Sequence, residues 1–437
     1  MRYILSAILL LVSITNLSAQ KVLSLKECLE TGLQNNYDLL IVRNEQQIAD
    51  NNATRANAGM LPTLDLSAGY NGTAKSTTTY PREGDSYTDA AAYDQTVDVG
   101  VSLGWTIFNG FKMQTNFKRL QELKTLGILR TRLEVEDFVA SLTAEYYNLI
   151  QQTLRLKNYR YAVALSRERL RITEARYRIG DFSRLDWLQA RVDFNADSSQ
   201  YMTQQELVTA SRIRINELMA NKDVTERCFA RDSVIEVNAE LKWDELEASM
   251  NESNSELLIA ARNTNISELD LKAAKSRNYP YLNLSAGYGY TRNLYGKNDP
   301  MGRGTLGPNV GLKLGFNIFD GNRRREQNNA RIEVENAQYT QEQLHQSLMA
   351  DLATFWQAYT NNLEVIKLEQ QNLIAAKENY EIAMERYLLG DLPGIEMREA
   401  QKSLLDAEER ILTAEYNTKL CEISLMQISG NVLEYMK

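Results

Sequence analysis

Residues Leu61–Tyr70 read LPTLDLSAGY, and residues Tyr279–Tyr288 read YPYLNLSAGY. A second stretch, Val99–Gly110 (VGVSLGWTIFNG), returns as Val310–Gly321 (VGLKLGFNIFDG). Because the matching stretches come in the same order, we interpret the chain as a tandem duplication with a unit of about 210 to 218 residues. That unit is far longer than the roughly 20–50 residues of a solenoid repeat, so each half must be a whole structural unit.

Both repeated stretches alternate between apolar residues and small or polar residues. Such a period of two is typical of strands whose two faces meet different surroundings. The predicted strands are roughly 10–14 residues long, against the usual ~5–6. Length, alternation and aromatic residues near the strand ends favour a transmembrane β-barrel over two soluble hairpins, with the small, polar face lining a water-filled lumen. The predicted lumen residues are Gly100, Ser102, Gly104, Gly287 and Gly289.

A long stretch without proline follows each predicted pair of strands. No proline occurs between Phe111 and Phe182, or between Asn322 and Leu392. Since proline inside a helix costs about 3 kcal/mol, these stretches permit very long helices. Apolar residues also follow the spacing of four and three that predicts a coiled coil. In the first half these residues are Val135, Val139, Leu142, Tyr146 and Leu149, and in the second half Leu348, Leu352, Phe355 and Tyr359.

The predicted organisation has a leader, two repeats and a linker between them. Helices are expected over residues 23–35 and 37–60, and the polar residues 71–93 are expected to form a loop. We predict a signal peptide over 1–19 and a linker over 222–243. The first repeat covers 20–221, with a β-hairpin at 61–108 and a helical hairpin at 111–221. The second repeat covers 244–437, with a β-hairpin at 279–319 and a helical hairpin at 322–430.

The first residues carry the pattern of a secretory signal. Arg2 precedes the apolar run Ile4–Ile14, and the small residue Ala19 marks the expected cleavage site. We therefore expect an exported protein. The formal charge of −8 gives no support for a nucleic-acid partner. Three scattered cysteines, Cys28, Cys228 and Cys421, are interpreted as buried thiols, although a disulfide is possible in an exported protein.

Four strands cannot close a barrel by themselves. Each unpaired backbone group in hydrocarbon costs several kcal/mol, so the two open edges of the sheet need partners from other copies. Two copies would give an eight-stranded barrel, whose interior is filled by side chains. Three copies would give twelve strands and space for a lumen. The fold class predicted is therefore an α+β membrane protein with four strands per chain in a trimeric, 12-stranded barrel, continued by a long α-helical coiled coil.

A third repeated motif lies where each long helix must reverse its direction. Arg176–Ala190 (RYRIGDFSRLDWLQA) returns as Arg386–Ala400 (RYLLGDLPGIEMREA). With the twice-repeated order of helix, two strands, long helix, tip and helix, these motifs make the chain similar to the TolC family of outer-membrane efflux proteins. In that family the tip reads roughly R-Y-x-x-G-x-x-x-x-x-D-V-L-x-A. The resemblance covers essentially the whole chain beyond the leader.

The resemblance implies a function and a set of partners. We expect a homotrimer in the outer membrane of a Gram-negative bacterium, in contact with outer-membrane lipid and with a helical tunnel across the periplasm. It would be the passive exit duct of a tripartite efflux or type I secretion system for small molecules or proteins. A periplasmic adaptor (membrane fusion protein) and an inner-membrane pump of the RND or ABC type would open its tip. The alternative is a structural envelope spacer with a coiled-coil stalk and no transport.

The tip motif contains the residues expected to dock the adaptor. Gly180 and Gly390 suit a reversal because a positive φ costs glycine little. The acidic residues that follow, Asp181 and Asp391, are expected to cap the next helix. The alternative is a helix-turn-helix without a docking role. The full docking set predicted is Arg176, Tyr177, Gly180, Asp181, Arg386, Tyr387, Gly390 and Asp391.

Acidic residues near the tip are candidates for a periplasmic gate. Glu396 and Glu399 are three apart, so they share one face of the returning helix. The matching positions in the family face the constriction, and the resemblance therefore implies a carboxylate ring that favours cations. Asp186 is the acid of the first copy, and the alternative for all three is a solvated helix face. Leu392 stands where some members carry a basic latch residue, and Arg398 is a candidate to replace it.

The sequence contains no recognisable enzyme motif. It has one histidine, no CxxC pair, no cluster of metal-ligand residues and no G-x-x-x-x-G-K-[ST] loop. Gly302–Gly307 fits G-x-G-x-x-G, but that fingerprint needs a helix to follow, whereas here a strand is expected. We interpret the segment as a flexible external loop. No catalysis, cofactor or bound metal is expected.

Overall fold

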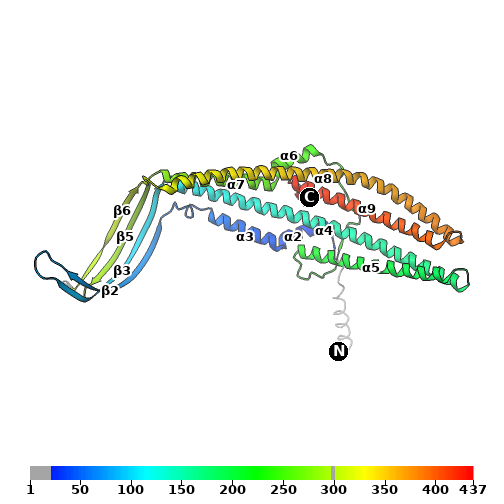
Figure 1. Cartoon of the computed structure of the whole chain (residues 1–437), viewed down its shortest axis with the longest axis horizontal. Coiled ribbons are helices and arrows are strands. Elements are labelled where there is room, and N and C mark those ends of the chain that lie inside the picture. The colour runs from blue at the N-terminus through cyan, green and yellow to red at the C-terminus, as the bar shows by residue number, and fades with distance from the viewer. Residues whose placement is uncertain (1–20, 297–300, 437) are drawn as a thin grey trace, which may run out of the picture. The chain divides into compact units, whose positions relative to one another are not determined.

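The computed structural model describes residues 21–296 and 301–436. The predicted signal peptide lies outside these residues. Figure 1 shows that a set of two helices, two strands and two long helices occurs twice along the chain. The elements are β1 (Lys21–Leu23), α2 (Leu25–Asn35), α3 (Tyr37–Asn52), β2 (Thr63–Thr79), β3 (Tyr87–Asn109), α4 (Lys112–Arg178), α5 (Arg184–Leu218), β4 (Cys228–Ala230), α6 (Trp243–Ser253), α7 (Ser255–Lys275), η1 (Ser276–Asn278), β5 (Tyr281–Leu294), β6 (Gly302–Gly315), α8 (Gly321–Leu389), α9 (Gly394–Ile428) and η2 (Val432–Met436).

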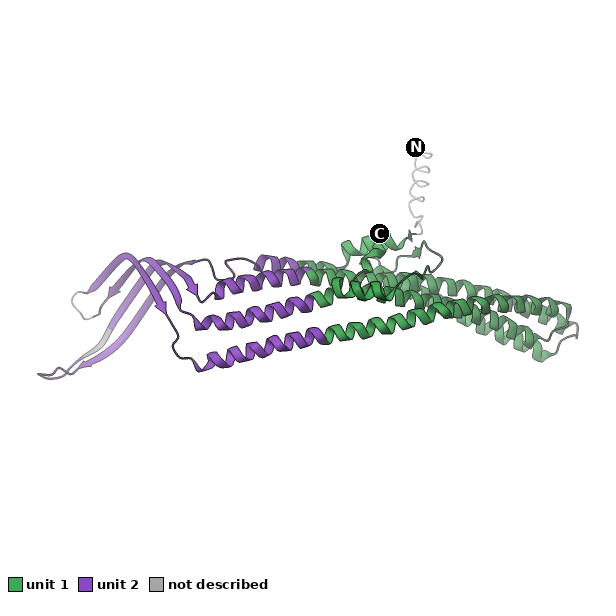
Figure 2. Cartoon of the chain, turned by 90° about the horizontal axis from the view of Figure 1, so that it is seen from above, with its two compact units in different colours: residues 1–44, 129–258, 343–437 green, residues 45–128, 259–342 purple. Residues whose placement is uncertain are grey.

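The chain divides into two compact units, which are coloured separately in Figure 2. Unit 1 takes its described residues from 1–44, 129–258 and 343–437, and unit 2 consists of 45–128 and 259–342. The boundaries of these units cut across the predicted repeats, because each repeat contributes to both units. Unit 2 holds all four long strands, and unit 1 holds the turns of both helical hairpins.

The sheet of unit 2 has the strand order β2-β3-β5-β6, and all three pairings are antiparallel. Ser102 on β3 lies opposite Asp65 on β2 and opposite Gly287 on β5, and Gly287 lies opposite Asn309 on β6. The next row toward the helices has the same small, polar character. Because adjacent residues in a strand point to opposite faces, this register places the predicted lumen residues on a single face. The opposite face carries Leu66, Val99, Val101, Tyr288, Tyr290, Leu306 and Val310.

The prediction of a loop over residues 71–93 was wrong. β2 continues to Thr79 and β3 begins at Tyr87, which leaves residues 80–86 as the connection. The polar residues form cross-strand pairs, each of which stabilises a hairpin by roughly 0.2–1 kcal/mol. These pairs are Tyr70 with Tyr93 (hydroxyl oxygens 3.0 Å apart), Thr78 with Thr88 (hydroxyl oxygens 3.0 Å apart) and Lys75 with Asp94 (Nζ to Oδ2, 2.6 Å).

Two further predictions about local structure were also wrong. Gly302–Gly307 is not an external loop, because it forms the first part of β6 and pairs with β5 from Leu294 to Gly289. The helix expected over 37–60 ends at Asn52. There the side-chain amide of Asn57 donates to the Asn52 carbonyl oxygen (3.0 Å), which satisfies a terminal acceptor of the helix and turns the chain.

The long helices of unit 1 pack along the two predicted coiled-coil seams. Val139, Leu142, Tyr146 and Leu149 on α4 are buried, as are Leu348, Leu352 and Tyr359 on α8. Heptad-like spacing of apolar residues is therefore confirmed as the pattern of burial. Among the residues that the structure describes, no helix is both long and apolar enough to cross a membrane.

The linker and both described ends of the chain meet in unit 1. β1 pairs in parallel with β4, a strand inside the predicted linker. β4 has only three residues, which are too few to show a strand pattern in the sequence. The short C-terminal helix η2 packs against α2 and α9. The thiols of Cys28, Cys228 and Cys421 are all buried, and none forms a disulfide with another described residue. Burial in an apolar setting therefore agrees with the structural role expected for them.

A buried charged pair lies beside η2. The Lys419 ammonium contacts the Glu422 carboxylate (Nζ to Oε1, 2.8 Å), and each side chain is 6% exposed. Glu422 also accepts a hydrogen bond from the Asn238 backbone N–H (2.9 Å) and one from the Tyr435 hydroxyl (2.7 Å). Lys419 lies 4.8 Å from the ring centre of Tyr147. This node joins α4, α9, the linker and the C-terminal segment.

Candidate functional site

The tip of each helical hairpin is built by a Schellman motif. Gly180, with φ +84°, donates its N–H to the Tyr177 carbonyl (3.0 Å), and the Asp181 N–H reaches the Arg176 carbonyl (2.9 Å). The second tip repeats both bonds around Gly390, whose φ is +89°. The spacing R-Y-x-x-G thus places arginine and tyrosine in the last turn of the helix and glycine where left-handed backbone is required.

The expectation that Asp181 and Asp391 cap the returning helices was wrong. α5 begins after Ser183, whose hydroxyl accepts from the Asp186 N–H (3.2 Å), while the Asp186 carboxylate accepts from the Ser183 N–H (3.1 Å). This is a complete capping box. α9 begins after Pro393, which makes no side-chain cap. The acidic residues lie too early in the chain to cap, because each belongs to the preceding Schellman turn, two positions before the N-cap of the new helix.

The two tips contact one another through Arg176 and Tyr387. The Arg176 guanidinium donates to the Leu388 carbonyl oxygen (3.2 Å) and lies over the ring of Phe182, 5.0 Å from its centre. Tyr387 is only 1% exposed, and its hydroxyl lies 3.1 Å from that of Thr173. Its counterpart in the first copy, Tyr177, is 36% exposed and stacks on Trp187. One tyrosine therefore holds the hairpins together, whereas the other faces outward.

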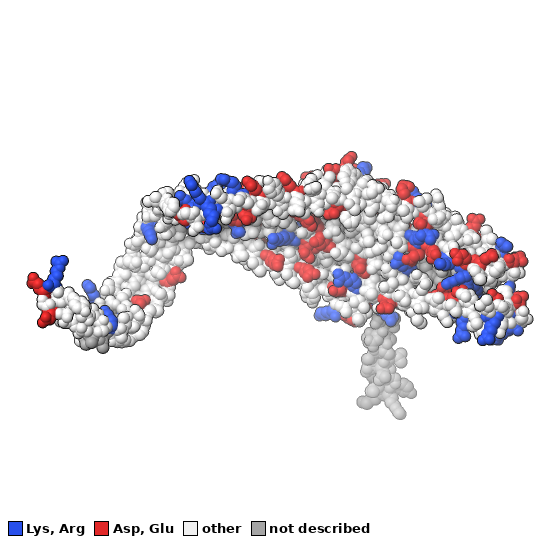
Figure 3. All heavy atoms as spheres, viewed as in Figure 1, with Lys and Arg blue, Asp and Glu red and all other residues white. Residues whose placement is uncertain are grey.

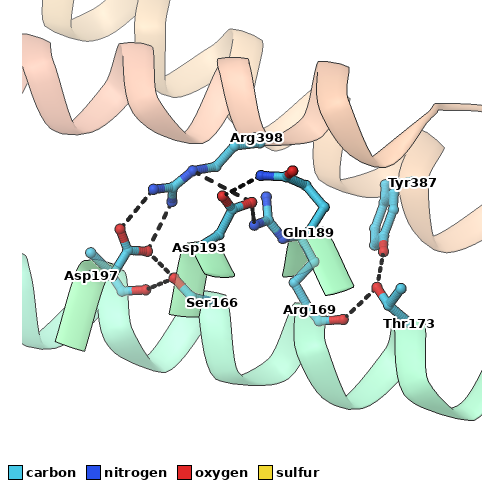
Figure 4. A network of polar contacts seen from close by, with 9 residues as sticks. Ser166, Arg169, Thr173, Gln189, Asp193, Asp197, Tyr387 and Arg398 are labelled. Atoms are coloured by element: carbon cyan, nitrogen blue, oxygen red, sulfur yellow. Dashed lines mark hydrogen bonds and ion pairs between the residues drawn. The ribbon is translucent and has the colours of Figure 1, made fainter. Parts of the chain in front are cut away.

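A chain of alternating charges links the two hairpins behind the tip (Figure 4). Arg398 on α9 binds both carboxylate oxygens of Asp197 on α5, at 2.8 and 2.7 Å. Its Nε lies 3.9 Å from Asp193, which also forms an ion pair with Arg169 on α4. The order Arg169, Asp193, Arg398, Asp197 alternates in sign, so each interior charge has a partner on both sides. Ser166 and Gln189 add hydrogen bonds to Asp197 and Asp193.

Burial makes this network sensitive to the loss of any member. Asp197 is 3% exposed and Arg169 is 6% exposed. Burial lowers the pKa of Arg169, and the Asp193 carboxylate opposes that effect. Burial likewise acts to lower the pKa of Arg398, but its bonds to Asp197 outweigh the burial, so the pKa is raised. Both guanidinium groups remain charged, since arginine is not deprotonated in proteins. The network is therefore an ionic tie between α9 of one hairpin and α5 of the other.

The predicted gate residues do not all lie together. Asp186 and Glu399 line one cavity of about 720 Å³ between the hairpins, together with Arg169 and Arg398. Glu396 is exposed on α9 and is not among the residues that line it. The carboxylate of Asp186 is also bound to the Ser183 hydroxyl (2.7 Å). Leu392, which replaces a basic residue of some family members, packs against the apolar cluster of the tip.

Several residues of the ionic tie were not identified from the sequence. Arg398 was singled out, but its partners Asp193 and Asp197 and the pair Ser166 and Arg169 were not. A signal was present, because the buried residues Ala162, Ser166, Arg169 and Thr173 are spaced four, three and four apart. Polar and charged residues at core positions of a coiled coil indicate a specific polar contact with a neighbouring helix.

Comparison with known proteins places the chain among bacterial outer-membrane channels. The family model described as outer membrane efflux protein matches residues 29–221 and again residues 248–431. The outer membrane protein TolC of Vibrio cholerae serotype O1 is 21% identical over 427 residues, covering 94% of this chain and 91% of that protein.

Two solved structures show the same fold. The CmeC outer membrane channel of Campylobacter jejuni matches with a TM-score of 0.80 at 16% identity, covering 93% of this chain and 85% of that one. The outer membrane protein VceC of Vibrio cholerae matches with a TM-score of 0.71 at 15% identity, covering 93% and 96%.

Proposed function

Because the chain belongs to the outer membrane efflux protein family, we propose that three copies of it form one continuous exit duct through the outer membrane and periplasm. Each copy would contribute its four long strands to a 12-stranded barrel and its long helices to a periplasmic tunnel. The observation that carries this proposal is the unpaired edge at both sides of the sheet. β2 and β6 each have one neighbour among the described strands, so their outer backbone groups need partners from other copies.

The two faces of the sheet support a barrel with an open lumen. One face is apolar, with Leu64 at 71% and Val310 at 77% exposure, which suits contact with lipid. The other face presents rows of glycine, serine and asparagine across all four strands. Gly100 and Gly289 lie directly opposite each other, and a Cβ on Gly100 would come 3.1 Å from the Gly289 Cα. Eight strands would leave an interior filled by side chains, whereas twelve leave space for water.

The surface of the tip favours the proposal that a periplasmic adaptor, which works with an inner-membrane pump, docks there. Large apolar side chains stand exposed around both turns, with Ile179 80%, Leu389 77% and Ile395 75% exposed. In an isolated chain, these side chains have no apolar cover, so they suit a partner that grips the tip. The proposed docking set remains Arg176, Tyr177, Gly180, Asp181, Arg386, Gly390 and Asp391, with the buried Tyr387 supporting that surface from beneath.

The ionic tie and the acidic residues suit a gate at the tip. Arg398, Asp197, Asp193 and Arg169 hold the two hairpins of one chain together, and this fits the latch role considered for Arg398 in place of Leu392. We assign Glu396, Glu399 and Asp186 to the acidic surface of the constriction. Three-fold symmetry would repeat these carboxylates around the opening and favour cations over anions.

Conductance separates this duct from a structural envelope spacer. Purified trimers in planar bilayers are expected to conduct ions, and the conductance should rise when the tip is opened. A spacer would show no conductance in any state. The assembly itself is tested by mass: the detergent-solubilised protein should have the mass of three chains. A stable, water-soluble single chain would contradict both the barrel and the duct.

The acidic surface gives a prediction about ion selectivity. Replacing Glu396 and Glu399 together with glutamine is expected to lower the preference of the channel for cations, because six carboxylates per trimer would lose their charge. The reversal potential under a salt gradient measures this preference. Glu378→Gln with Glu381→Gln is a matched control, since these exposed glutamates are also three apart on a helix. Equal selectivity of both double variants and the parent would reject the assignment.

The tip glycines give a prediction about docking. Gly180→Ala combined with Gly390→Ala is expected to weaken efflux, because an alanine in left-handed backbone costs about 1–2 kcal/mol at each turn. A built Cβ on Gly180 meets no atom within 4 Å, so the cost comes from the backbone and not from a clash. Drug susceptibility of cells that express the variant measures the effect. As a control, Gly394→Ala at the start of α9 should leave efflux unchanged. Wild-type efflux in the Gly180→Ala, Gly390→Ala double variant would show that the turn conformation is not needed for docking.

A further inference from the structure

Exposed cations gather in unit 2 where the helices adjoin the strands. Figure 3 shows Lys and Arg side chains clustered at this place, next to a stretch of strand surface that is almost free of charge. Lys112 opens α4 directly after β3, and Arg324 ends the first turn of α8 after β6, with Arg325 next to it. Lys272 and Lys275 lie in the last turn of α7, ahead of β5. We name these five residues the cation collar, and all of them are exposed.

The cation collar has no anionic partner in the described part of the chain. None of its five residues forms an ion pair with another described residue. Three acidic side chains at this end already have partners: Arg277 contacts both Asp320 and Glu326, and Arg119 binds Asp270 at 2.7 Å. Local positive charge is therefore left uncompensated, although the whole protein carries −8. An outside anion is the partner that such a patch favours.

Helix stability does not explain the position of three of these cations. The first turns of α4 and α8 contain no acidic residue; Lys112 and Arg324 lie in them, and Arg325 follows directly. The N-terminal end of a helix dipole is positive, so a cation there is unfavourable for the helix. Lys272 and Lys275, at a helix C-terminus, have the favourable orientation. Lys112, Arg324 and Arg325 are thus placed against the preference of their own helices.

An apolar and aromatic belt lies between the cation collar and the strands. Phe111, Tyr279 and Phe316 are 56%, 52% and 55% exposed, and Phe319 is 87% exposed. Phe111 makes edge-to-face contacts with Phe108 and Tyr279, at centroid distances of 5.1 and 6.0 Å. Aromatic belts of this kind mark the level of the headgroups in membrane proteins. The order of strand, aromatic belt and cations along the chain matches the order of hydrocarbon, interface and phosphate in a lipid leaflet.

We propose that the cation collar binds the phosphate groups of anionic phospholipids in the periplasmic leaflet of the outer membrane. This inference rests on the proposed function, because it needs the sheet to lie in that membrane. The arginines provide paired N–H donors that suit phosphate oxygens, and the aromatic belt contacts the adjoining glycerol and upper acyl chain. The bound lipids would fix the depth of the barrel by electrostatics in addition to hydrophobic matching.

Lipid retention by the detergent-solubilised trimer tests the proposal. The trimer is incubated with equal amounts of dioleoyl phosphatidylglycerol and dioleoyl phosphatidylcholine, and the retained lipids are counted by native mass spectrometry. At about 1 kcal/mol for each cation that acts on a phosphate, two such cations would make phosphatidylglycerol preferred about thirtyfold. Lys112→Gln, Arg324→Gln and Arg325→Gln together should reduce that preference to within about twofold, since the main attraction for the anionic headgroup is removed.

A matched triple variant separates the cation collar from a general loss of positive charge. Arg43→Gln, Lys222→Gln and Arg227→Gln remove the same number of exposed cations from unit 1, and the lipid preference should stay as in the parent. The proposal is overturned if the parent shows no preference or if both triple variants lose it equally. If the first triple variant fails to assemble, the salt dependence of the parent protein is the test. Raising NaCl from about 0.05 to about 0.5 M must weaken the preference for phosphatidylglycerol if that preference is electrostatic. Conductance in pure phosphatidylcholine tests the duct separately from the lipid site.

Discussion

Trimers that carry Arg398→Leu are expected to be open for a larger fraction of the time than the parent protein. The substitution removes both bonds to Asp197, which is 3% exposed, and leaves Arg169, the partner of Asp193, as the remaining cation of the network. Removing one partner of a buried ion pair typically costs about 3–5 kcal/mol. If the tie holds the hairpins together in the closed tip, that cost falls on the closed state, and the ratio of open to closed channels rises by roughly two to four orders of magnitude.

Single-channel recording in planar bilayers measures the expected change. Arg410→Leu is the control, because Arg410 also lies on α9 and pairs with Glu369 at 3.0 Å, but its side chain is 51% exposed. Its effect should stay below about 1 kcal/mol. Adding Asp197→Asn to Arg398→Leu removes the unpaired charge and should return part of the closed population. An open probability that is identical in Arg398→Leu and the parent would show that the network stabilises the hairpins without acting as a latch.

A loss of thermal stability is expected from Glu422→Leu. The variant leaves the Lys419 ammonium, which is 6% exposed, without its carboxylate partner and leaves the Asn238 N–H and Tyr435 hydroxyl without their acceptor. An uncompensated buried charge costs about 3–5 kcal/mol. The rings of Tyr147 and Tyr435 recover only part of that, since a cation–π contact contributes about 2 kcal/mol when desolvated. Burial and the Glu422 carboxylate raise the pKa of Tyr147 to about 12, so its ring stays uncharged near neutral pH.

The chain offers a control that differs from this pair mainly in burial. Glu364 and Lys367 are also three apart on a helix and lie at the same 2.7–2.8 Å separation, but their side chains are 69% and 66% exposed. Glu364→Leu should therefore change the midpoint of thermal unfolding far less than Glu422→Leu. The double variant Lys419→Met with Glu422→Leu should recover much of the loss, because both charges are gone. Equal midpoints for Glu422→Leu and Glu364→Leu would show that the node contributes little.

The sequence predicted the features that follow from the spacing of residues within one segment. Its predictions failed for features that depend on contacts between segments far apart in the chain. The alternation around Gly100 and Ser102 correctly predicted the two faces of the sheet, because a period of two fixes which residues share a face. The polar ends of β2 and β3 were interpreted as a loop, since pairs such as Thr78 with Thr88 exist only after the strands meet. A polar composition by itself does not distinguish an exposed strand from a loop.

The tip shows the same limit at the scale of single residues. Arg176 and Gly180 were correctly placed at the reversal, because glycine in left-handed backbone is a local requirement. The cap was assigned to Asp181 and lies on Ser183, since Asp181 belongs to the Schellman turn two positions before the N-cap. Tyr177 and Tyr387 occupy equivalent positions of the repeat, yet one is exposed and the other buried. That difference arises from packing between hairpins, which a repeat in the sequence does not record.

The unequal length of the strands has a consequence for the cell surface. β3 has 23 residues and β5 has 14, and β3 pairs with β5 only from Gln95 onward. A strand needs about 9–11 residues to cross a bilayer, so the part of the β2–β3 hairpin farthest from the helices extends beyond it. Three such polar ribbons would stand outside each proposed trimer, where antibodies and bacteriophages first encounter the bacterium.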